Sequence, residues 1–382
     1  MMQRLSLIAL CAVLMMAAPA RAELQPEELS TETLPEKLPP HWVWVDDINF
    51  FNMADGRVYL IDGDTGRFVG MVSGGYGHAT IGLDRRGDRF VVPGVFYSRG
   101  SRGDRTDVLT LYPVKSLVPS AEIVIPAKKF NGIPFIGNFT LTDDGRFAMV
   151  YNFTPEQSVT VADLDAKSVV GEFPTPGCGL IYPVGMRRFM MQCGDNSMQL
   201  ASLDASGKVV LGGVSKPLWT QSDLATEKAV RIDDSRWMFF TYNSQVIVID
   251  GAGDKPSVAE QWSLVGTNPD GWRLGGVQPS AYHAGTGRLY VLMHQGGPYT
   301  RKDPGKEVWV FDVKTRLRVQ RIELASAATS IAVSQDAEPL LYAAEFGVPA
   351  LSIYDAATGK KLRTVEQLGQ TLSFIQPAPV VN

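Results

Sequence analysis

The stretch that decides the fold is Asp55-Gly56-Arg57-Val58-Tyr59-Leu60-Ile61-Asp62-Gly63-Asp64-Thr65-Gly66-Arg67-Phe68-Val69-Gly70-Met71-Val72. It begins with a turn of Asp, Gly and a basic residue. A hydrophobic strand ending in Asp follows, then a Thr-Gly turn and a second strand. β-Branched and aromatic residues bounded by Gly and Asp are typical of short strands joined by tight turns.

The same pattern of turn, strand, gap, second strand and Asp recurs along the chain. Further clear copies start at Asp144, Gly287 and Pro339, and weaker copies fill the gaps between them. One residue marks each copy, and the marks are Asp62, Tyr112, Asp163, Asp204, Asp250, Asp312 and Asp355. Successive marks are 50, 51, 41, 46, 62 and 43 residues apart.

Seven units of this length, each with about four short strands, are the signature of a β-propeller. One blade cannot bury both of its faces, whereas a ring of blades covers every face. Helical repeats would need an apolar period of 3.6 residues, which we do not see. We therefore predict an all-β fold, a seven-bladed β-propeller over residues 46–382. The recurrent Asp is expected to order the turn between the outer strands.

Composition excludes several classes of function. The 382 residues carry 36 Lys and Arg against 40 Asp and Glu, a formal net charge of −4. The sequence has no basic stripe of the kind that binds along a phosphate backbone, so nucleic acid is not an expected partner. Three Cys and four His leave little material for a metal site, and we predict none. The chain also lacks the nucleophile-elbow and phosphate-loop motifs.

The first 22 residues have the pattern of a secretory signal peptide. Arg4 supplies the positive charge, residues 5–18 form an uncharged apolar run, and Ala20-Arg21-Ala22 is a small-residue cleavage site. The run is too short to span a bilayer. We predict cleavage after Ala22 and export to the periplasm of a Gram-negative host, with no membrane attachment. Residues 23–45 are predicted to form an N-terminal arm ahead of the propeller.

Two cysteines, Cys178 and Cys193, remain after the predicted cleavage. An even number in an exported chain indicates one disulfide. Both lie in strand-like stretches on either side of a Pro-Val-Gly turn, so they can face each other across a hairpin. A redox-active pair is the alternative, but such pairs usually have the closer Cys-x-x-Cys spacing.

Two long polar insertions, residues 96–107 and 294–307, interrupt the period and are expected to be loops that carry binding. The first contains Arg99, Arg102 and Arg105 at every third position beside acidic residues. They are either solvated loop residues with weak ion pairs or anchors for a docked partner. His294 begins the second insertion and is a candidate for the same interface.

Several segments, each weak alone, together carry a family resemblance. They are residues 59–63 and 66–72, the Arg-containing stretch 96–107, Cys178 and Cys193 followed by Gly194-Asp195, Gly271-Trp272-Arg273-Leu274-Gly275-Gly276, and residues 281–283 with 288–294. Over essentially the whole mature chain, the sequence resembles the heavy subunit of periplasmic methylamine and aromatic amine dehydrogenases. Some segments resemble the aromatic branch and others the methylamine branch, so the branch stays open.

The resemblance implies a seven-bladed propeller that pairs with a small, cysteine-rich light chain in an α2β2 heterotetramer. It also implies that the light chain carries the cofactor, tryptophan tryptophylquinone, and the catalytic base, so that this chain holds neither a cofactor nor catalytic residues. The implied reaction is oxidative deamination of a primary amine to aldehyde and ammonia, with electrons passed to a blue copper protein.

The resemblance further implies that a heavy-chain Phe lines the substrate channel. This Phe follows the first short strand, Val43-Trp44-Val45-Asp46-Asp47. Counting from that strand places it at Phe51, and an ungapped alignment to the aromatic branch favours Phe50. The alternative is that both rings only pack within a blade.

Two other functions remain open at this point. One is a stand-alone periplasmic propeller that binds a ligand or partner protein without redox activity. The other is a propeller enzyme with its own metal or cofactor in the central channel, against which the scattered His residues argue.

Overall fold

The computed structural model describes residues 32–267, 270–297 and 299–379. The chain divides into two units, residues 1–33 and 34–382, and the second is compact. The predicted signal peptide, residues 1–22, and the start of the predicted arm, residues 23–31, lie outside the described residues. The second unit is built from β-strands, together with a short 3-10 helix, η1 (Ile136–Asn138).

The strand order of the described residues resolves into seven four-stranded blades, which fits the predicted number. From the inner to the outer strand, the first three blades are β28 (Leu372–Pro377), β1 (Trp42–Asp47), β2 (Gly56–Asp62), β3 (Phe68–Gly75); β4 (Gly82–Leu83), β5 (Arg89–Tyr97), β6 (Arg105–Pro113), β7 (Ala121–Ile125); and β8 (Phe139–Leu141), β9 (Phe147–Asn152), β10 (Ser158–Asp163), β11 (Ser168–Pro174). Blades four and five are β12 (Cys178–Pro183), β13 (Arg188–Cys193), β14 (Met198–Leu203), β15 (Val209–Val214); and β16 (Val230–Arg231), β17 (Arg236–Phe240), β18 (Gln245–Asp250), β19 (Ser257–Ser263).

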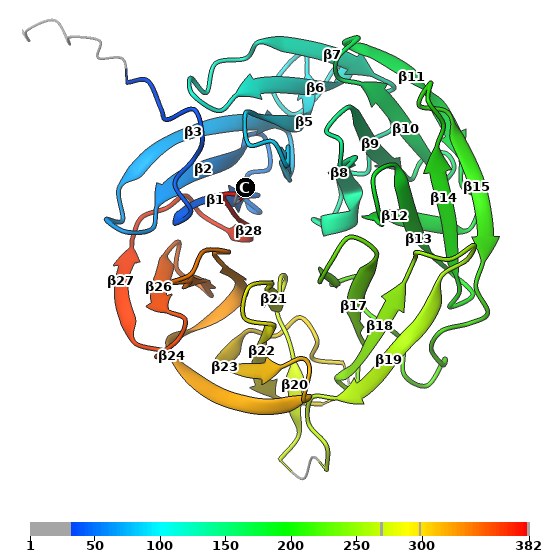
Figure 1. Cartoon of the computed structure of the whole chain (residues 1–382). Helices are drawn as coiled ribbons and strands as arrows, with labels where there is room; N and C mark the ends of the chain where they lie inside the picture. Colours follow the sequence, from blue (N-terminus) through cyan, green and yellow to red (C-terminus); the bar gives the residue numbers. More distant parts are fainter. Residues whose placement is uncertain (1–31, 268–269, 298, 380–382) are drawn as a thin grey trace, which may run out of the picture. The chain divides into compact units, whose positions relative to one another are not determined.

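The last two blades share one long strand. Blade six is β21 (Ser280–His283), β22 (Arg288–Gln295), β23 (Gly305–Asp312) and the first part of β24 (Leu317–Val333), with β20 (Trp272–Leu274) also paired to β22. Blade seven is the second part of β24, then β25 (Leu340–Glu345), β26 (Leu351–Asp355) and β27 (Lys361–Val365). Figure 1 shows the blades arranged around a common centre.

The ring is closed by strands from the two ends of the second unit. The C-terminal strand β28 is the innermost strand of the first blade and pairs with β1, with Val43 opposite Pro377 and Val45 opposite Ile375. β1 begins at Trp42, so the propeller starts before the expected boundary between residues 45 and 46. Leu34 and Leu38, in the predicted arm, are buried in the same hydrophobic cluster as Trp42.

The core consists of seven hydrophobic clusters among the described residues, and each one joins two neighbouring blades. Successive strand residues point to opposite faces of a blade. Leu289 and Val291 of β22 therefore pack toward blade five, while Tyr290 and Leu292 pack toward blade seven. A single cluster contains residues of blades seven and one, so apolar burial is continuous around the ring. This confirms the predicted all-β propeller.

The repeat marks occupy equivalent positions, at or next to the end of the third strand of each blade. In six blades the mark is an Asp whose carboxylate accepts backbone N–H groups of the following turn; examples are Asp163 from Asp165 and Ala166, and Asp355 from Thr358. The first copy of the repeat begins one strand later within its blade than the other copies do. Its Asp-Gly-Arg turn precedes the third strand and not the second, because β1 and β28 supply the two inner strands.

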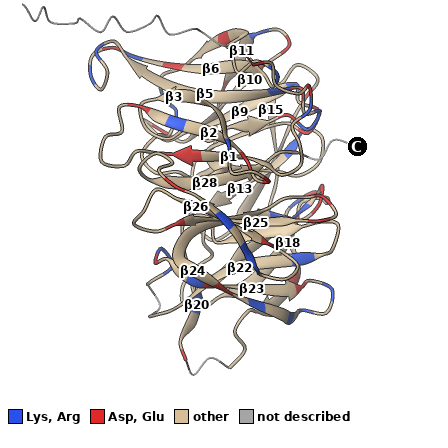
Figure 2. Ribbon diagram, turned by 90° about the vertical axis from the view of Figure 1, so that its left-hand side faces the viewer, with Lys and Arg blue, Asp and Glu red and all other residues tan. Residues whose placement is uncertain are grey.

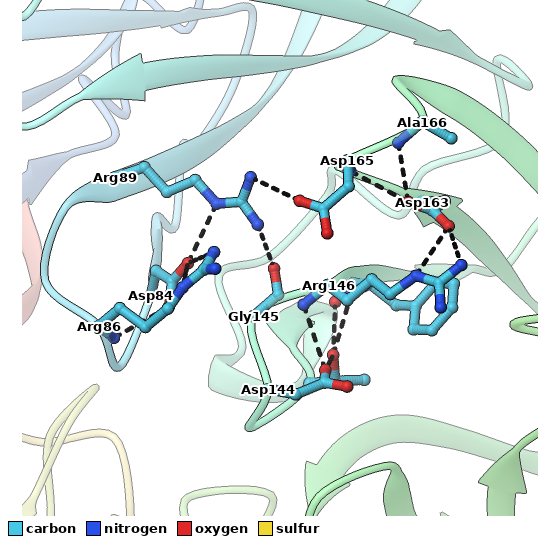
Figure 3. A network of polar contacts seen from close by, with 11 residues as sticks. Asp84, Arg86, Arg89, Asp144, Gly145, Arg146, Asp163, Asp165 and Ala166 are labelled. Atoms are coloured by element: carbon cyan, nitrogen blue, oxygen red, sulfur yellow. Dashed lines mark hydrogen bonds and ion pairs between the residues drawn. The ribbon is translucent and has the colours of Figure 1, made fainter. Parts of the chain in front are cut away.

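Charged residues cluster at strand ends and turns, and the strands are largely uncharged (Figure 2). Figure 3 shows the ion pairs where the turns of blades two and three meet. Arg89 of β5 donates to Asp84 and to the Gly145 carbonyl, and reaches Asp165 of the next blade at 3.2 Å. These contacts join blades through their turns, at the end of the ring where third and fourth strands connect.

Candidate functional site

Phe50, Phe51, Arg99 and Arg102 lie on loops that join second and third strands, and Arg105 and His294 lie in the strand ends beside such loops. Because neighbouring strands of a blade are antiparallel, these loops all emerge at one end of the ring, here called the loop face. Its loops are residues 48–55, 98–104, 153–157, 194–197, 241–244, 296–304 (298 not described) and 346–350. The predicted residues come from blades one, two and six, so the structure brings them to one face without gathering them in one pocket.

Phe50 and Phe51 stand at the tip of the loop between β1 and β2. Their exposed fractions are 60% and 89%, and their rings meet edge to face with centroids 5.7 Å apart. The loop turns at Asn49, which has a φ of 45°, and the Asn52 N–H donates to the Asn49 carbonyl at 2.7 Å. Both rings therefore project from the loop face and do not pack within a blade.

The first insertion is shorter as a loop than predicted. β5 and β6 extend the hairpin until Tyr97 lies opposite Arg105, so only residues 98–104 form the loop. At its tip, Arg99 and Arg102 are exposed, and neither forms an ion pair with another described residue. These two side chains remain candidates for a partner interface.

Arg105 has a different role from the other two arginines. Its guanidinium binds both oxygens of the fully buried Asp107 at 2.7 Å each, and also donates to the Lys129 carbonyl at 2.8 Å. These contacts hold the connection between β7 and β8 against blade two. Arg105 thus stabilises the fold beneath the loop face and is not free to anchor a partner.

His294 is also placed away from the surface. Its side chain is buried, and Nε2 lies 2.8 Å from the Thr300 hydroxyl, which pins the loop after β22. Burial is the main cause that lowers the pKa of His294. We therefore do not retain His294 as an interface residue, because a buried neutral ring that closes its own loop offers little to a partner.

The predicted disulfide is confirmed. Cys178 of β12 and Cys193 of β13 are directly opposite each other in the hairpin, and their sulfur atoms are bonded. The bridge lies at the loop-face end of blade four, beside the loop 194–197. It ties the inner strand to the second strand at the point where the chain enters the blade.

Sequence reasoning missed a group of buried ionisable residues under the loop face. Burial raises the pKa of Asp46 to about 7 and lowers the pKa of Lys129 to about 8. Burial, followed by the charge of Lys129, holds the pKa of His78 well below its usual range. An acidic pair at the end of an otherwise apolar strand was the only signal for Asp46. No sequence pattern indicates that Lys129 and His78 are buried, because the residues that surround them belong to separate blades.

Further exposed aromatic residues on the loop face were also missed. Phe153 is 52% exposed on the loop after β9, Phe346 is 59% exposed on the loop after β25, and Tyr299 is 83% exposed on the loop after β22. Large exposed apolar side chains that share one face are typical of interaction surfaces. That they share one face depends on loop positions that only the ring arrangement defines.

Two cavities lie inward of these loops. One, of about 230 Å³, is lined by residues that include Phe374 of the inner strand β28, Trp237 of β17, and Phe135 and Gln278 of connecting segments. The other, of about 500 Å³, lies between the loops of blades three to five and includes Phe153 and Trp219.

In residues 32–267, 270–297 and 299–379, no group of three or more His, Cys, Asp or Glu side chains is arranged to hold a metal ion. No helix within these ranges is long and apolar enough to cross a membrane.

Comparison with known proteins identifies the family. The family model for the methylamine dehydrogenase heavy chain matches residues 40–378, which is nearly the whole propeller. The chain belongs to the methylamine dehydrogenase heavy chain family. Relatives in this family include the heavy chains of Paracoccus versutus, 33% identical over 86% of this chain and 77% of that one, and of Methylorubrum extorquens, 32% identical over 86% and 80%. The family resemblance seen in the sequence is thus confirmed.

Solved structures support the fold of this heavy chain family member. A dihydro-heme d1 dehydrogenase matches with a TM-score of 0.58 at 16% identity, over 92% of this chain and 78% of that one. The β-propeller domain of Myceliophteria thermophila Cps50 matches with a TM-score of 0.59 at 8% identity, over 87% and 98%. At such identities the likeness concerns the propeller fold alone.

Proposed function

We propose that this chain is the large, scaffolding subunit of a periplasmic, tryptophan tryptophylquinone-dependent amine dehydrogenase. The overall reaction converts a primary amine and water to an aldehyde, ammonia, two electrons and two protons. The quinone, carried by a small light chain, supplies the two-electron oxidation, and the electrons pass to a blue copper protein. The single observation that carries this proposal is the family match over residues 40–378.

In this assignment the loop face receives the light chain in an α2β2 heterotetramer. The exposed aromatic residues of that face supply apolar area that a partner can bury. The guanidinium groups of Arg99 and Arg102 form no ion pair with another described residue and are available for acidic groups or carbonyls of the light chain.

Phe51 and Phe50 are proposed to line the substrate channel. Two rings that project from a short loop can form an apolar wall against which the alkyl part of an amine packs. A wall of this kind discriminates substrates by size, because one methylene in an apolar pocket changes the rate by about 10–200-fold. Methylamine is the first substrate to test, since relatives of this chain are named methylamine dehydrogenase heavy chains.

The proposed compartment agrees with two features of the chain. Residues 1–22 have the pattern of a cleaved export signal, and the Cys178–Cys193 disulfide suits an oxidising environment. The light chain would require the same environment if it is as cysteine-rich as the family resemblance implies.

The test is expression of the full gene neighbourhood in its own host, followed by mild purification of this chain through an affinity tag. We expect a co-eluting polypeptide of about one third of its mass and a visible quinone absorption that bleaches when methylamine is added. A colourless single chain that is inert to amines would reject the dehydrogenase subunit and favour the stand-alone binding propeller.

A further inference from the structure

Asp47, the last residue of β1, occupies an unusual position beneath Phe50 and Phe51. Its carboxylate is buried and accepts four hydrogen bonds. Oδ1 accepts the N–H groups of Asn49 at 3.0 Å and Thr371 at 2.7 Å. Oδ2 accepts the Gln370 N–H at 3.0 Å and the Tyr59 hydroxyl at 3.1 Å. Two donors on each oxygen satisfy a buried carboxylate, and all four donors are uncharged.

These donors come from three separate segments. Asn49 belongs to the loop that carries the two rings, Tyr59 to β2, and Gln370 and Thr371 to the connection between β27 and β28. The raised pKa of Tyr59, about 12, results from burial followed by the charge of Asp47, and it keeps the phenol protonated as a donor. Asp47 thus joins the loop to the strand that closes the ring.

Further contacts extend this attachment along the loop. The Ile48 N–H donates to the Thr371 carbonyl at 3.2 Å, and the Phe50 N–H donates to the Thr371 hydroxyl at 3.4 Å. Together with the bond from Asn49 to Asp47, every backbone N–H from Ile48 to Phe50 therefore has a partner. The backbone that leads into the two exposed rings is held from below while the rings themselves are free.

The close approach to Asp47 also depends on Gly369. A Cβ atom at this position would lie 2.1 Å from Asp47 Oδ2, and its φ of +72° is one that side chains other than Gly rarely adopt. The chain can therefore present the Gln370 and Thr371 N–H groups to the carboxylate only because residue 369 has no side chain.

We infer that Asp47 is a positioning residue that holds Phe50 and Phe51 in the orientation that selects amines by size. The selectivity part of this inference rests on the proposed function. An Asn at this position would place an N–H₂ group against backbone N–H donors and lose part of the bond set. The loop would then move, and the apolar wall formed by the rings would discriminate amines less sharply.

The experiment compares Asp47→Asn, Phe51→Ala and a control, Asp55→Asn, in the holoenzyme with its light chain. Asp55 lies in the same loop, but its carboxylate binds Arg57 and Ser73 and not the backbone under the rings. We measure kcat/KM for methylamine and n-butylamine, together with hydrogen exchange of the amides at residues 49, 370 and 371. Thr371→Val, which removes only the hydroxyl that accepts from Phe50, serves if Asp47→Asn fails to fold.

We expect Asp47→Asn to speed amide exchange at these residues by about tenfold or more, since they lose a charge-assisted hydrogen bond. We expect its methylamine-to-butylamine selectivity ratio to shift about fivefold, in the same direction as in Phe51→Ala. Thr371→Val should shift the ratio in that direction by a smaller factor, and Asp55→Asn should leave exchange and ratio unchanged.

Two results would overturn the inference. One is unchanged amide exchange in Asp47→Asn; the other is a selectivity shift in Phe51→Ala that neither Asp47→Asn nor Thr371→Val reproduces. Failure of the proposed function looks different. In that case Phe51→Ala itself leaves the ratio unchanged, or no amine is oxidised, while the exchange data still decide whether Asp47 holds the loop.

Discussion

Arg231 and Asp143 form a two-point ion pair between blades that are not neighbours. The guanidinium of Arg231, on β16 of blade five, donates to both oxygens of Asp143, in the turn before β9 of blade three, at 2.8 and 2.7 Å. Arg85 of blade two approaches the same carboxylate at 3.3 Å and reaches Asp234 of blade five at 3.0 Å. The network therefore spans the inner ends of three blades, where hydrophobic clusters between neighbours cannot act.

Replacing Arg231 by Met should lower the free energy of unfolding by about 2 kcal/mol. Both partners are mostly buried, and removing one leaves a carboxylate with only the weaker Arg85 contact. Urea unfolding of the wild type, Arg231→Met, Asp143→Asn and the double variant measures this. The double variant should lose clearly less than the sum of the single losses, and a simple sum would show that the two side chains act independently.

His41 should make the stability of the ring closure depend on pH. Its ring lies 2.7 Å from Asp64 of blade one and 3.0 Å from Asp336 of blade seven. Burial lowers its pKa, but the Asp64 hydrogen bond and the charges of Asp336 and Asp64 outweigh this and raise it above 6.5. The folded chain therefore binds the proton more tightly than the unfolded chain. The resulting stabilisation is complete below pH 6.5 and is lost as the pH rises through the raised pKa.

The measurement compares wild type with His41→Gln in unfolding experiments from pH 5.5 to 9. The difference in stability between the two should be largest at the acidic end and should shrink as the pH rises. Groups that titrate equally in both proteins, such as Asp46, cancel in this comparison. A difference that stays constant across the range would contradict the prediction.

Removing the disulfide should destabilise the propeller without changing its fold. The bridge closes a loop with a sequence separation of 15 residues, for which the unfolded-state entropy corresponds to about 3 kcal/mol. We expect Cys178→Ser/Cys193→Ser to unfold at lower urea concentration with an unchanged circular dichroism spectrum. Reductant should destabilise the wild type to the same extent and leave the double variant unaffected. Equal stability of the wild type and the double variant without reductant would refute the prediction.

The turn aspartates should contribute different amounts to the free energy of unfolding, according to the number of groups that each one binds. Asp163 accepts two backbone N–H groups and pairs with Arg146, whereas Asp250 accepts a single hydrogen bond from the described residues, that of the Ala252 N–H. Asp163→Ala should therefore cost about 2 kcal/mol and Asp250→Ala about 1 kcal/mol. Thermal unfolding of both variants gives the comparison, and a larger loss for Asp250→Ala would contradict the prediction.

Much of the fold was predictable because the interactions that define it are local. The strand–turn copies around Asp62, Asp163 and Asp355 predict blades. In each copy the Asp accepts hydrogen bonds from N–H groups of its own turn, which are only a few residues away in the sequence. The same holds for Cys178 and Cys193, which are brought together by one hairpin. Phe50 and Phe51 were selected by resemblance, and their exposure on the loop face agrees with that choice without testing it.

Other features depended on the closed ring and could not be predicted from local pattern. Arg105 looked like a free loop residue, but its hairpin extends and places it on Asp107. His294 was a candidate for the partner interface, but its ring is buried and binds the Thr300 hydroxyl of the loop that follows it.

By itself, the sequence determined the strand repeat, the turn chemistry, the disulfide and the family, because these depend on neighbours along the chain. Tertiary structure alone decided that β28 pairs with β1, that Arg231 meets Asp143, and that Asp47 binds Gln370 and Thr371. Each of these contacts joins residues that are 88 or more positions apart, so they exist only when the ring of blades has closed.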